Sequence, residues 1–176
     1  MNNTKKLTFT ALLTALAMII PIAFGFMRVV IGPFTATLTS HVPMFLAMLF
    51  GPSVAIMVGL GSALGFFMAA GPIVGARALM HVIVGVMGAV LINKGVSFKK
   101  VIAFTAPVHG ILEALVVALF ISGGMVPKYS GTMLYYILVV VGIGTILHHT
   151  ADGLISGVLI KAMSKVSNYE FIKQAR

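Results

Sequence analysis

The residues LTFTALLTALAMIIPIAFGF, which occupy positions 7–26, contain no charged side chain. A run of about 20 apolar residues is long enough for an α-helix to cross the hydrocarbon core of a bilayer. No small-residue cleavage site followed by a polar mature segment comes after it, so we expect a retained helix rather than a signal peptide. The first element of the chain is therefore predicted to span a membrane.

Five more apolar runs follow, and the composition agrees with them. Of the 176 residues, 60% are hydrophobic and only 9% are charged, whereas soluble domains are about 25% charged. We predict an all-α integral membrane protein, in which residues 1–176 form one domain, a bundle of six transmembrane helices. The runs are residues 7–26, 38–50, 53–70, 75–93, 101–123 and 133–160. The second run is too short for a full crossing, so we expect a tilted or partial helix there.

Residues 27–37 differ in kind from the apolar runs. They combine the β-branched residues at 29–31 with Gly32-Pro33, a turn-forming pair, and then with alternating threonines. Such residues favour strands and turns over helix. We expect an ordered loop, including a short hairpin, packed on the bundle between the first two helices.

The basic residues indicate the orientation of the bundle. If the N-terminus is inside, nine Lys and Arg fall on the inner side and three on the outer side, a positive-inside bias. Both termini are then cytoplasmic, and residues 165–176 form a short basic tail. Because the formal charge of +9 lies mostly in connections and tails, we expect contact with lipid and no nucleic acid. The inner set is Lys5, Lys6, Lys94, Lys99, Lys100, Lys161, Lys165, Lys173 and Arg176, and the outer set is Arg28, Arg77 and Lys128.

Small residues four apart give a helix a flat face that another helix can approach closely. Two glycine pairs of this kind, Gly61 with Gly65 and Gly153 with Gly157, are predicted to pack helices within the bundle. The alanine pair, Ala11 and Ala15, lies in the first helix within an uncharged stretch. This strip either packs internally or docks a separate membrane protein.

Ionisable side chains inside the apolar runs are costly and are therefore functional candidates. They occur in three sets at helical spacing, which puts each set on one helix face. Each set has a structural alternative: Arg77 can extend to the outer interface, and the other two can be interhelical hydrogen bonds. The sets are Arg77 with His81, His109 with Glu113, and His148 or His149 with Asp152.

An outer cationic cluster is predicted from the depth of these residues. Arg77 and His81 lie within roughly 10 Å of the outer end of their helix at 1.5 Å per residue. His41, at the outer start of the second run, and Arg28 in the loop lie near the same level. Because the arginine fork matches a planar carboxylate, the cluster predicts a pocket for a small anionic ligand.

Several other chemistries are not supported by the sequence. It contains no H-E-x-x-H metal motif, no G-x-x-x-x-G-K-[ST] phosphate loop and no G-x-S-x-G nucleophile motif,. We therefore predict no bound metal, no cofactor, no ATP hydrolysis by the chain itself and no enzymatic activity.

The size, the six apolar runs, the inner termini, the ordered first loop and the Ala11/Ala15 strip resemble the S components of energy-coupling factor (ECF) transporters. The resemblance covers the whole chain. It implies a substrate-binding subunit whose alanine strip docks a transmembrane coupling subunit, while two ATPase subunits supply the energy. The missing phosphate loop agrees with that division of labour.

Two stretches resemble the niacin-specific branch of this family: VIGPFTATLTSHVP at residues 30–43 and ARALMH at residues 76–81. No histidine stands at position 2, which departs from the nickel and cobalt S components. The implied ligand is nicotinate, a small planar carboxylate with a pyridine nitrogen, and the implied location is the cell membrane.

The resulting hypothesis assigns roles to the pocket residues. Arg77, or alternatively Arg28, clamps the carboxylate, and His81 or His41 bonds the ring nitrogen. An aromatic side chain covers the ring, and the loop at 27–37 is the lid. The predicted ligand-binding residues are Arg77, His81, Arg28, His41, Thr39, Phe34, Tyr136 and Glu113.

Three alternatives remain open. The first is an S component for another small water-soluble vitamin or anion. The second is a solitary channel or proton-coupled carrier using Glu113, Asp152, His109 and His148, since acids within a membrane often relay protons. The third is a structural membrane subunit without a ligand.

Overall fold

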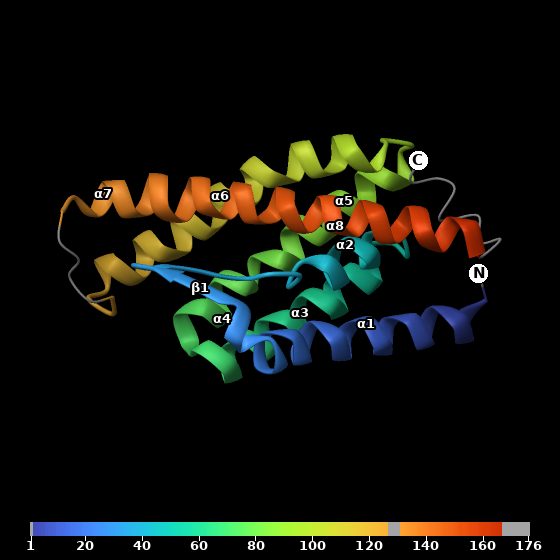
Figure 1. Cartoon of the computed structure of the whole chain (residues 1–176), viewed down its shortest axis with the longest axis horizontal. Coiled ribbons are helices and arrows are strands. Elements are labelled where there is room, and N and C mark those ends of the chain that lie inside the picture. The colour runs from blue at the N-terminus through green and yellow to red at the C-terminus, as the bar shows by residue number, and fades with distance from the viewer. Residues whose placement is uncertain (1, 127–130, 167–176) are drawn as a thin grey trace.

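Helix α1 (Asn3–Ala23) begins after Asn2, whose side chain accepts a 3.0 Å hydrogen bond from the backbone N–H of Lys5. Such a cap satisfies one of the N–H groups that the first helical turn leaves unpaired. The computed structural model of the chain describes residues 2–126 and 131–166. In it, α1 runs along one side of an elongated helical bundle (Figure 1), so the long first helix is confirmed.

The later helices are separated by glycine and proline. Helices α3 and α4 each begin with a proline, which has no N–H to leave unpaired, and each follows a glycine with positive φ, Gly51 or Gly71. The helical elements are α2 (Val42–Met48), α3 (Pro52–Ala70), α4 (Pro72–Ala78), α5 (Met80–Asn93), α6 (Phe98–Ser122), α7 (Met133–Tyr135), the π-helical η2 (Tyr136–Ile143) and α8 (Gly144–Val166).

Among the described residues, five helical spans are long and apolar enough to cross a membrane. The sixth predicted segment, residues 38–50, contains only the seven-residue helix α2, which is too short to span alone. The all-α membrane bundle is thus supported, while the count of six full helices and the inner location of the termini stay predictions. The spans are Asn3–Ala23, Pro52–Ala70, Pro72–Asn93, Phe98–Ser122 and Met133–Lys165.

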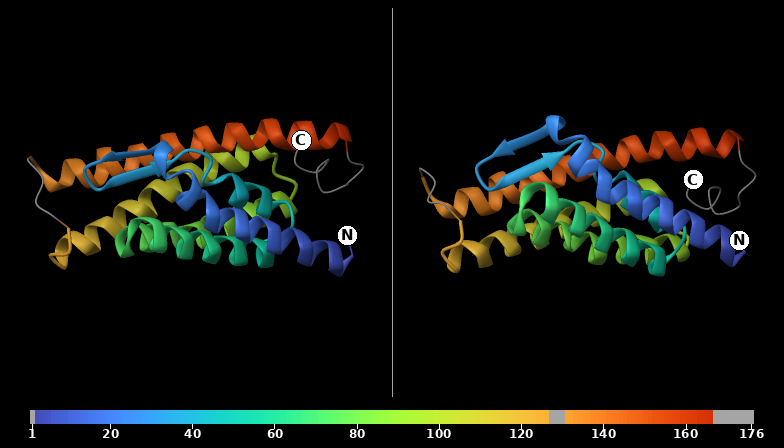
Figure 2. Two further views of the ribbon diagram at one scale, coloured as in Figure 1. Left: turned by 60° about the horizontal axis from the view of Figure 1, so that its bottom comes forward. Right: turned by 90° about the horizontal axis from the view of Figure 1, so that it is seen from below.

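The chain between α1 and α3 nevertheless returns along the bundle. A 3₁₀ turn, η1 (Gly25–Met27), leads into a hairpin, after which strand β2 and the buried helix α2 run back toward the start of α1. As a result, α1 begins and α8 ends at the same end of the bundle (Figures 1 and 2). Of the predicted outer loop and basic tail, residues 127–130 and 167–176 lie outside the described residues.

The hairpin predicted in the first loop is confirmed. Strand β1 (Arg28–Ile31) pairs antiparallel with β2 (Phe34–Thr37), so that Arg28 lies opposite Thr37. A two-residue turn needs positive φ at its first position, which Gly32 provides at 56°,. The β1 residues at 29–31 are exposed, whereas Phe34 and Thr37 of β2 are buried against the helices.

Helices α1 and α3 approach closely through glycine, as the Gly61/Gly65 spacing predicted. A Cβ on Gly61 would lie 2.6 Å from the Cγ2 of Thr14, and one on Gly65 would lie 2.5 Å from the backbone oxygen of Met18. Beside this contact, α2 forms the centre of the core, with Phe45 and Met48 fully buried. The core therefore fixes the position of His41, which directly precedes α2.

Candidate functional site

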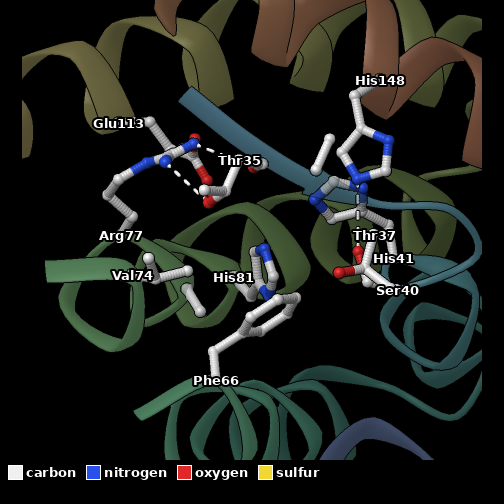
Figure 3. Close-up of a pocket in the computed structure, with 12 residues that line it drawn as sticks. Thr35, Thr37, Ser40, His41, Phe66, Val74, Arg77, His81, Glu113 and His148 are labelled. Carbon is white, nitrogen blue, oxygen red and sulfur yellow. Dashed lines mark hydrogen bonds and ion pairs between the residues drawn. The ribbon is translucent and has the colours of Figure 1, made fainter. Parts of the chain in front are cut away.

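A small pocket lies where the hairpin covers the helices. Its volume is about 20 Å³, room for about one water molecule. Strand β2, the turn before α2 and five helices contribute to it (Figure 3). The lining residues are Thr35, Ala36, Thr37, Ser40, His41, Phe66, Val74, Arg77, Ala78, His81, Glu113 and His148.

The guanidinium of Arg77 on α4 forms one wall of this pocket and is almost fully buried. It donates to Glu113 Oε2 on α6 from Nε at 3.1 Å and from Nη2 at 2.5 Å. Its Nη1 donates to the hairpin at Pro33 O (3.0 Å) and Thr35 Oγ1 (3.1 Å), while the ring of Phe34 lies 5.8 Å from its Cζ. Arg77 thus ties the hairpin to α6, as Figure 3 shows for Thr35 and Glu113.

Glu113 has two carboxylate oxygens in different surroundings. Besides Arg77, Oε2 accepts a 2.7 Å hydrogen bond from Thr145 Oγ1 on α8. Oε1 lies 3.3 Å from His109 Nε2 one turn earlier on α6, but the geometry there is not that of a hydrogen bond. His109 Nε2 therefore has no hydrogen-bond partner among the described residues although it is buried.

Asp152 on α8 holds the turn that leads into α2. Its Oδ1 accepts from the backbone N–H of Thr39 at 2.8 Å, and its Oδ2 accepts from that of His41 at 2.9 Å. Oδ2 also lies 3.1 Å from His41 Nδ1 and 3.6 Å from His148 Nε2. Thr39 has a φ of 72°, unfavourable for a β-branched residue, and these bonds hold it in that conformation.

The five histidines of the chain form one cluster beside the pocket, in which His148 is partly exposed and the other four are buried. The ring of His41 lies 4.4–5.6 Å from each of the other four ring centroids. Hydroxyl groups from three elements hold the rings: Ser62 at 2.8 Å from His81 Nδ1, Ser40 at 3.2 Å from His148 Nε2 and Thr105 at 2.9 Å from His149 Nε2. The cluster is therefore a rigid polar core surrounded by apolar helices.

A curated relative supplies the family. The niacin transporter NiaX of Lactococcus lactis subsp. cremoris is 32% identical to this chain over 189 aligned positions, which cover 100% of the chain and 84% of NiaX. The chain belongs to the NiaX family. No family model matches it, and no solved structure matches it. With a transporter as relative and five apolar spans, it is a multi-pass protein of the cell membrane.

Within this NiaX family member, the structure brings half of the eight predicted ligand-binding residues together. Arg77, His81, His41 and Glu113 all line the pocket. Since Arg77 is buried and paired, it does not extend to the outer interface. The niacin-branch resemblance of residues 30–43 and 76–81 falls on strand β2, the turn before α2, and the segment with Arg77 and His81. These two stretches contribute eight of the twelve lining residues.

The other four predicted residues lie outside the lining set. Thr39 contacts Asp152 through its backbone, and Phe34 packs against Val117 and Val141 behind Arg77. Tyr136 begins η2 and has its ring 5.7 Å from that of Tyr135. Their predicted ligand contacts stay predictions.

Arg28, the alternative clamp, has a different environment. It donates to Pro21 O at 2.7 Å, to Ala69 O at 3.2 Å and to Thr37 Oγ1 at 3.4 Å. Carbonyl groups at the ends of α1 and α3 therefore occupy its guanidinium, which fastens the base of the hairpin to the two helices. Of the two predicted clamps, only Arg77 lines the pocket.

The hydroxyl residues of the site could not be predicted from the sequence. Thr35, Ser62, Thr105 and Thr145 each hold a buried charged group or imidazole. A hydroxyl residue in an apolar helix commonly bonds its own preceding turn, so its presence alone carries no signal. The partner of Ser62, for example, lies 19 residues along the chain.

Proposed function

We propose that this member of the NiaX family is the substrate-binding subunit of an ECF-type importer and that it captures nicotinate from outside the cell. The observation that carries the proposal is the buried guanidinium of Arg77 beside the imidazoles of His41 and His81 in one pocket. A planar carboxylate matches the arginine fork, and a pyridine nitrogen can accept a hydrogen bond from a neighbouring imidazole. The relative NiaX is named a niacin transporter, which supports nicotinate as the ligand.

Ligand entry requires the hairpin to move. Pockets that bind small molecules enclose roughly 300–1,000 Å³, against about 20 Å³ here. Arg77 joins the hairpin at Pro33 and Thr35 to Glu113. A ligand carboxylate can replace one of these acceptors as the partner of Arg77. The guanidinium then stays paired with a negative charge while the hairpin lifts, so the hairpin serves as the lid.

The energy for transport is proposed to come from partner subunits. The sequence has no phosphate loop for ATP. Ala11 and Ala15 are exposed on the side of α1 that faces away from the bundle, next to the large exposed side chains of Leu12 and Leu16. This face is the proposed docking surface for a transmembrane coupling subunit, which in turn binds two ATPase subunits.

Binding of nicotinate to the purified chain tests the proposal. We expect saturable binding of radiolabelled nicotinate and a rise in melting temperature with nicotinate concentration, because a ligand that binds only the folded state stabilises it. Nicotinamide, which is planar but lacks the carboxylate, should compete poorly. Absence of saturable binding would remove nicotinate as the ligand.

Uptake by the chain alone separates a binding subunit from a solitary carrier. Proteoliposomes that contain only this chain should not accumulate nicotinate under a pH gradient. Accumulation under those conditions would instead support a proton-coupled carrier that uses Glu113 and Asp152. Ala11→Leu together with Ala15→Leu should abolish uptake in cells while leaving nicotinate binding to the purified chain unchanged.

A further inference from the structure

Three histidines from separate parts of the chain, two on helices and one just before a helix, converge beside the pocket. His41 precedes α2, His81 lies on α5 and His109 lies on α6. Their ring centroids are 4.7, 4.9 and 5.1 Å apart in the three pairings. One ring nitrogen from each lies within 4.8 Å of those of the other two, and all three side chains are buried.

The Nδ1 atom of each ring is already engaged. His81 Nδ1 lies 2.8 Å from Ser62 Oγ, His41 Nδ1 lies 3.1 Å from Asp152 Oδ2, and His109 Nδ1 lies 3.0 Å from His149 Nδ1. Metal-binding histidines characteristically use one nitrogen for an orienting partner and the other for the metal. No hydrogen bond of the described residues uses Nε2 of these three rings, and that of His109 is buried without a partner.

A carboxylate oxygen stands next to the three rings. Glu113 Oε1 lies 3.3 Å from His109 Nε2, and Arg77 and Thr145 both bond the other oxygen, Oε2. Three imidazoles and one carboxylate oxygen are ligands that suit zinc, nickel and related ions. Donor atoms around zinc at 2.0–2.1 Å are about 3.4 Å apart, so ring nitrogens that lie within 4.8 Å of one another need to approach by at most about 1.4 Å.

We propose that His41, His81 and His109, with Glu113 as the fourth donor, form a buried site for a divalent transition metal such as Zn²⁺. No short sequence motif indicates this site, because the three histidines come from different elements far apart in the chain. Ser62 and Asp152 are positioning residues that orient two of the rings.

The charge of the site gives the metal a role in binding an anion, a step that rests on the proposed function. With neutral imidazoles, the buried charged groups of the described residues are one cation, Arg77, and two carboxylates, Glu113 and Asp152. The next cation, Arg28, is bound to the carbonyls of Pro21 and Ala69 instead. An added carboxylate would bring more negative charge into an apolar bundle, which is costly. A divalent ion reverses the balance and offers the ligand a positive site, which in the metal-loaded protein replaces the imidazoles of His41 and His81 as the partner of the pyridine nitrogen.

Cobalt binding tests the metal site directly. The full chain is purified with an affinity tag that lacks histidine, treated with a chelator and titrated with Co²⁺ alone, followed by the visible absorption of the ion. We expect the absorption to saturate at one equivalent and to be reversed by Zn²⁺. His81→Gln and His109→Gln should weaken binding by more than about 100-fold, since even changes to an orienting partner typically cost 10–100-fold.

Three further variants show whether the assignment is right. Ser62→Ala should weaken cobalt binding by about 10–100-fold through loss of the partner of His81. Thr150→Val should not change it, because the Thr150 hydroxyl donates to its own helix at Ile146 O. His148→Gln should retain the site. If His148→Gln abolishes the cobalt spectrum and His81→Gln does not, the assigned ligand set is wrong. Equal melting temperatures of the variants without metal establish that they are folded.

Nicotinate binding is measured separately on the metal-free and Zn²⁺-loaded protein. We expect at least tenfold tighter binding to the loaded form. A chain that shows no cobalt absorption overturns the metal site, even if it binds nicotinate. A chain that binds one equivalent of cobalt through His81 and His109 but no nicotinate in either form overturns the proposed ligand and retains the site.

Discussion

Arg77 contacts both the hairpin and Glu113, so its removal affects stability as well as ligand binding. Arg77→Ala leaves a buried carboxylate without its cation, and breaking a buried pair in this way costs about 3–5 kcal/mol. We expect the free energy of unfolding to fall by about that amount. Denaturant unfolding in detergent measures it.

A double variant separates the two roles of Arg77. Replacing a buried ion pair by apolar side chains of similar volume is often neutral, so Arg77→Met with Glu113→Leu should recover most of the lost stability. Because the guanidinium is absent, the double variant should still not bind nicotinate. Wild-type nicotinate affinity in this stable variant would contradict the clamp.

Asp152 is predicted to hold the turn before α2. Asp152→Asn keeps the shape of the side chain but removes the charge that two backbone N–H groups contact. Hydrogen bonds to charged groups contribute about 1.5–3 kcal/mol, so we expect a loss of about 1–3 kcal/mol in the free energy of unfolding. Thr150→Val on the same helix serves as the control and should change stability by less than about 0.5 kcal/mol.

Local spacing predicted some residues of the site and could not predict others. The pair at positions 109 and 113 is close because residues four apart share a helix face,. The contact between Arg77 and Glu113 joins residues 36 apart, so it depends on how α4 packs against α6. Arg28 shares the charge of Arg77, but only the fold shows that helix-end carbonyls bind it.

Between helices, the α1–α3 contact depends on glycine at position 65. Gly65→Ala would bring a Cβ within 2.5 Å of the backbone oxygen of Met18, and backbone cannot move aside as a flexible side chain can. We expect a loss of about 1–3 kcal/mol, typical of overpacking. Gly157→Ala is the matched control, because its nearest contact would be 3.8 Å from Phe98 and alanine favours helix. Equal melting temperatures for the two variants would contradict this packing.

The long helices could be predicted because apolar runs end at glycine, proline and lysine. The second run was harder, since strand β2, a turn and α2 share it and all of them contain apolar residues. Hydrophobicity alone cannot distinguish a short buried helix from part of a transmembrane helix. The division of the span Pro72–Asn93 into α4 and α5 was missed for the same reason.

For the molecule as a whole, the path of the chain decides which side each end faces. Five crossings alone would put the two ends on opposite sides, but the return through β2 and α2 brings the start of α1 and the end of α8 to the same end of the bundle (Figure 2). The nine-to-three distribution of Lys and Arg predicts that this end lies in the cytoplasm,. On that prediction the hairpin faces outward, where the proposed lid over an outer pocket is needed.

The absence of cysteine from the sequence allows this orientation to be tested one position at a time. A single cysteine replaces one exposed residue at a time, in the variants Val30→Cys, Lys94→Cys and Lys165→Cys. Intact cells that carry each variant are treated with a maleimide that cannot cross membranes. We expect Val30→Cys to react at once, and the two lysine replacements to react only after the cells are permeabilised, with the cysteine-free protein as the blank. If both lysine replacements react in intact cells together with Val30→Cys, the ends of α5 and α8 lie outside, and the return through α2 does not cross the membrane. If Val30→Cys reacts only after permeabilisation, the outward-facing lid loses its basis.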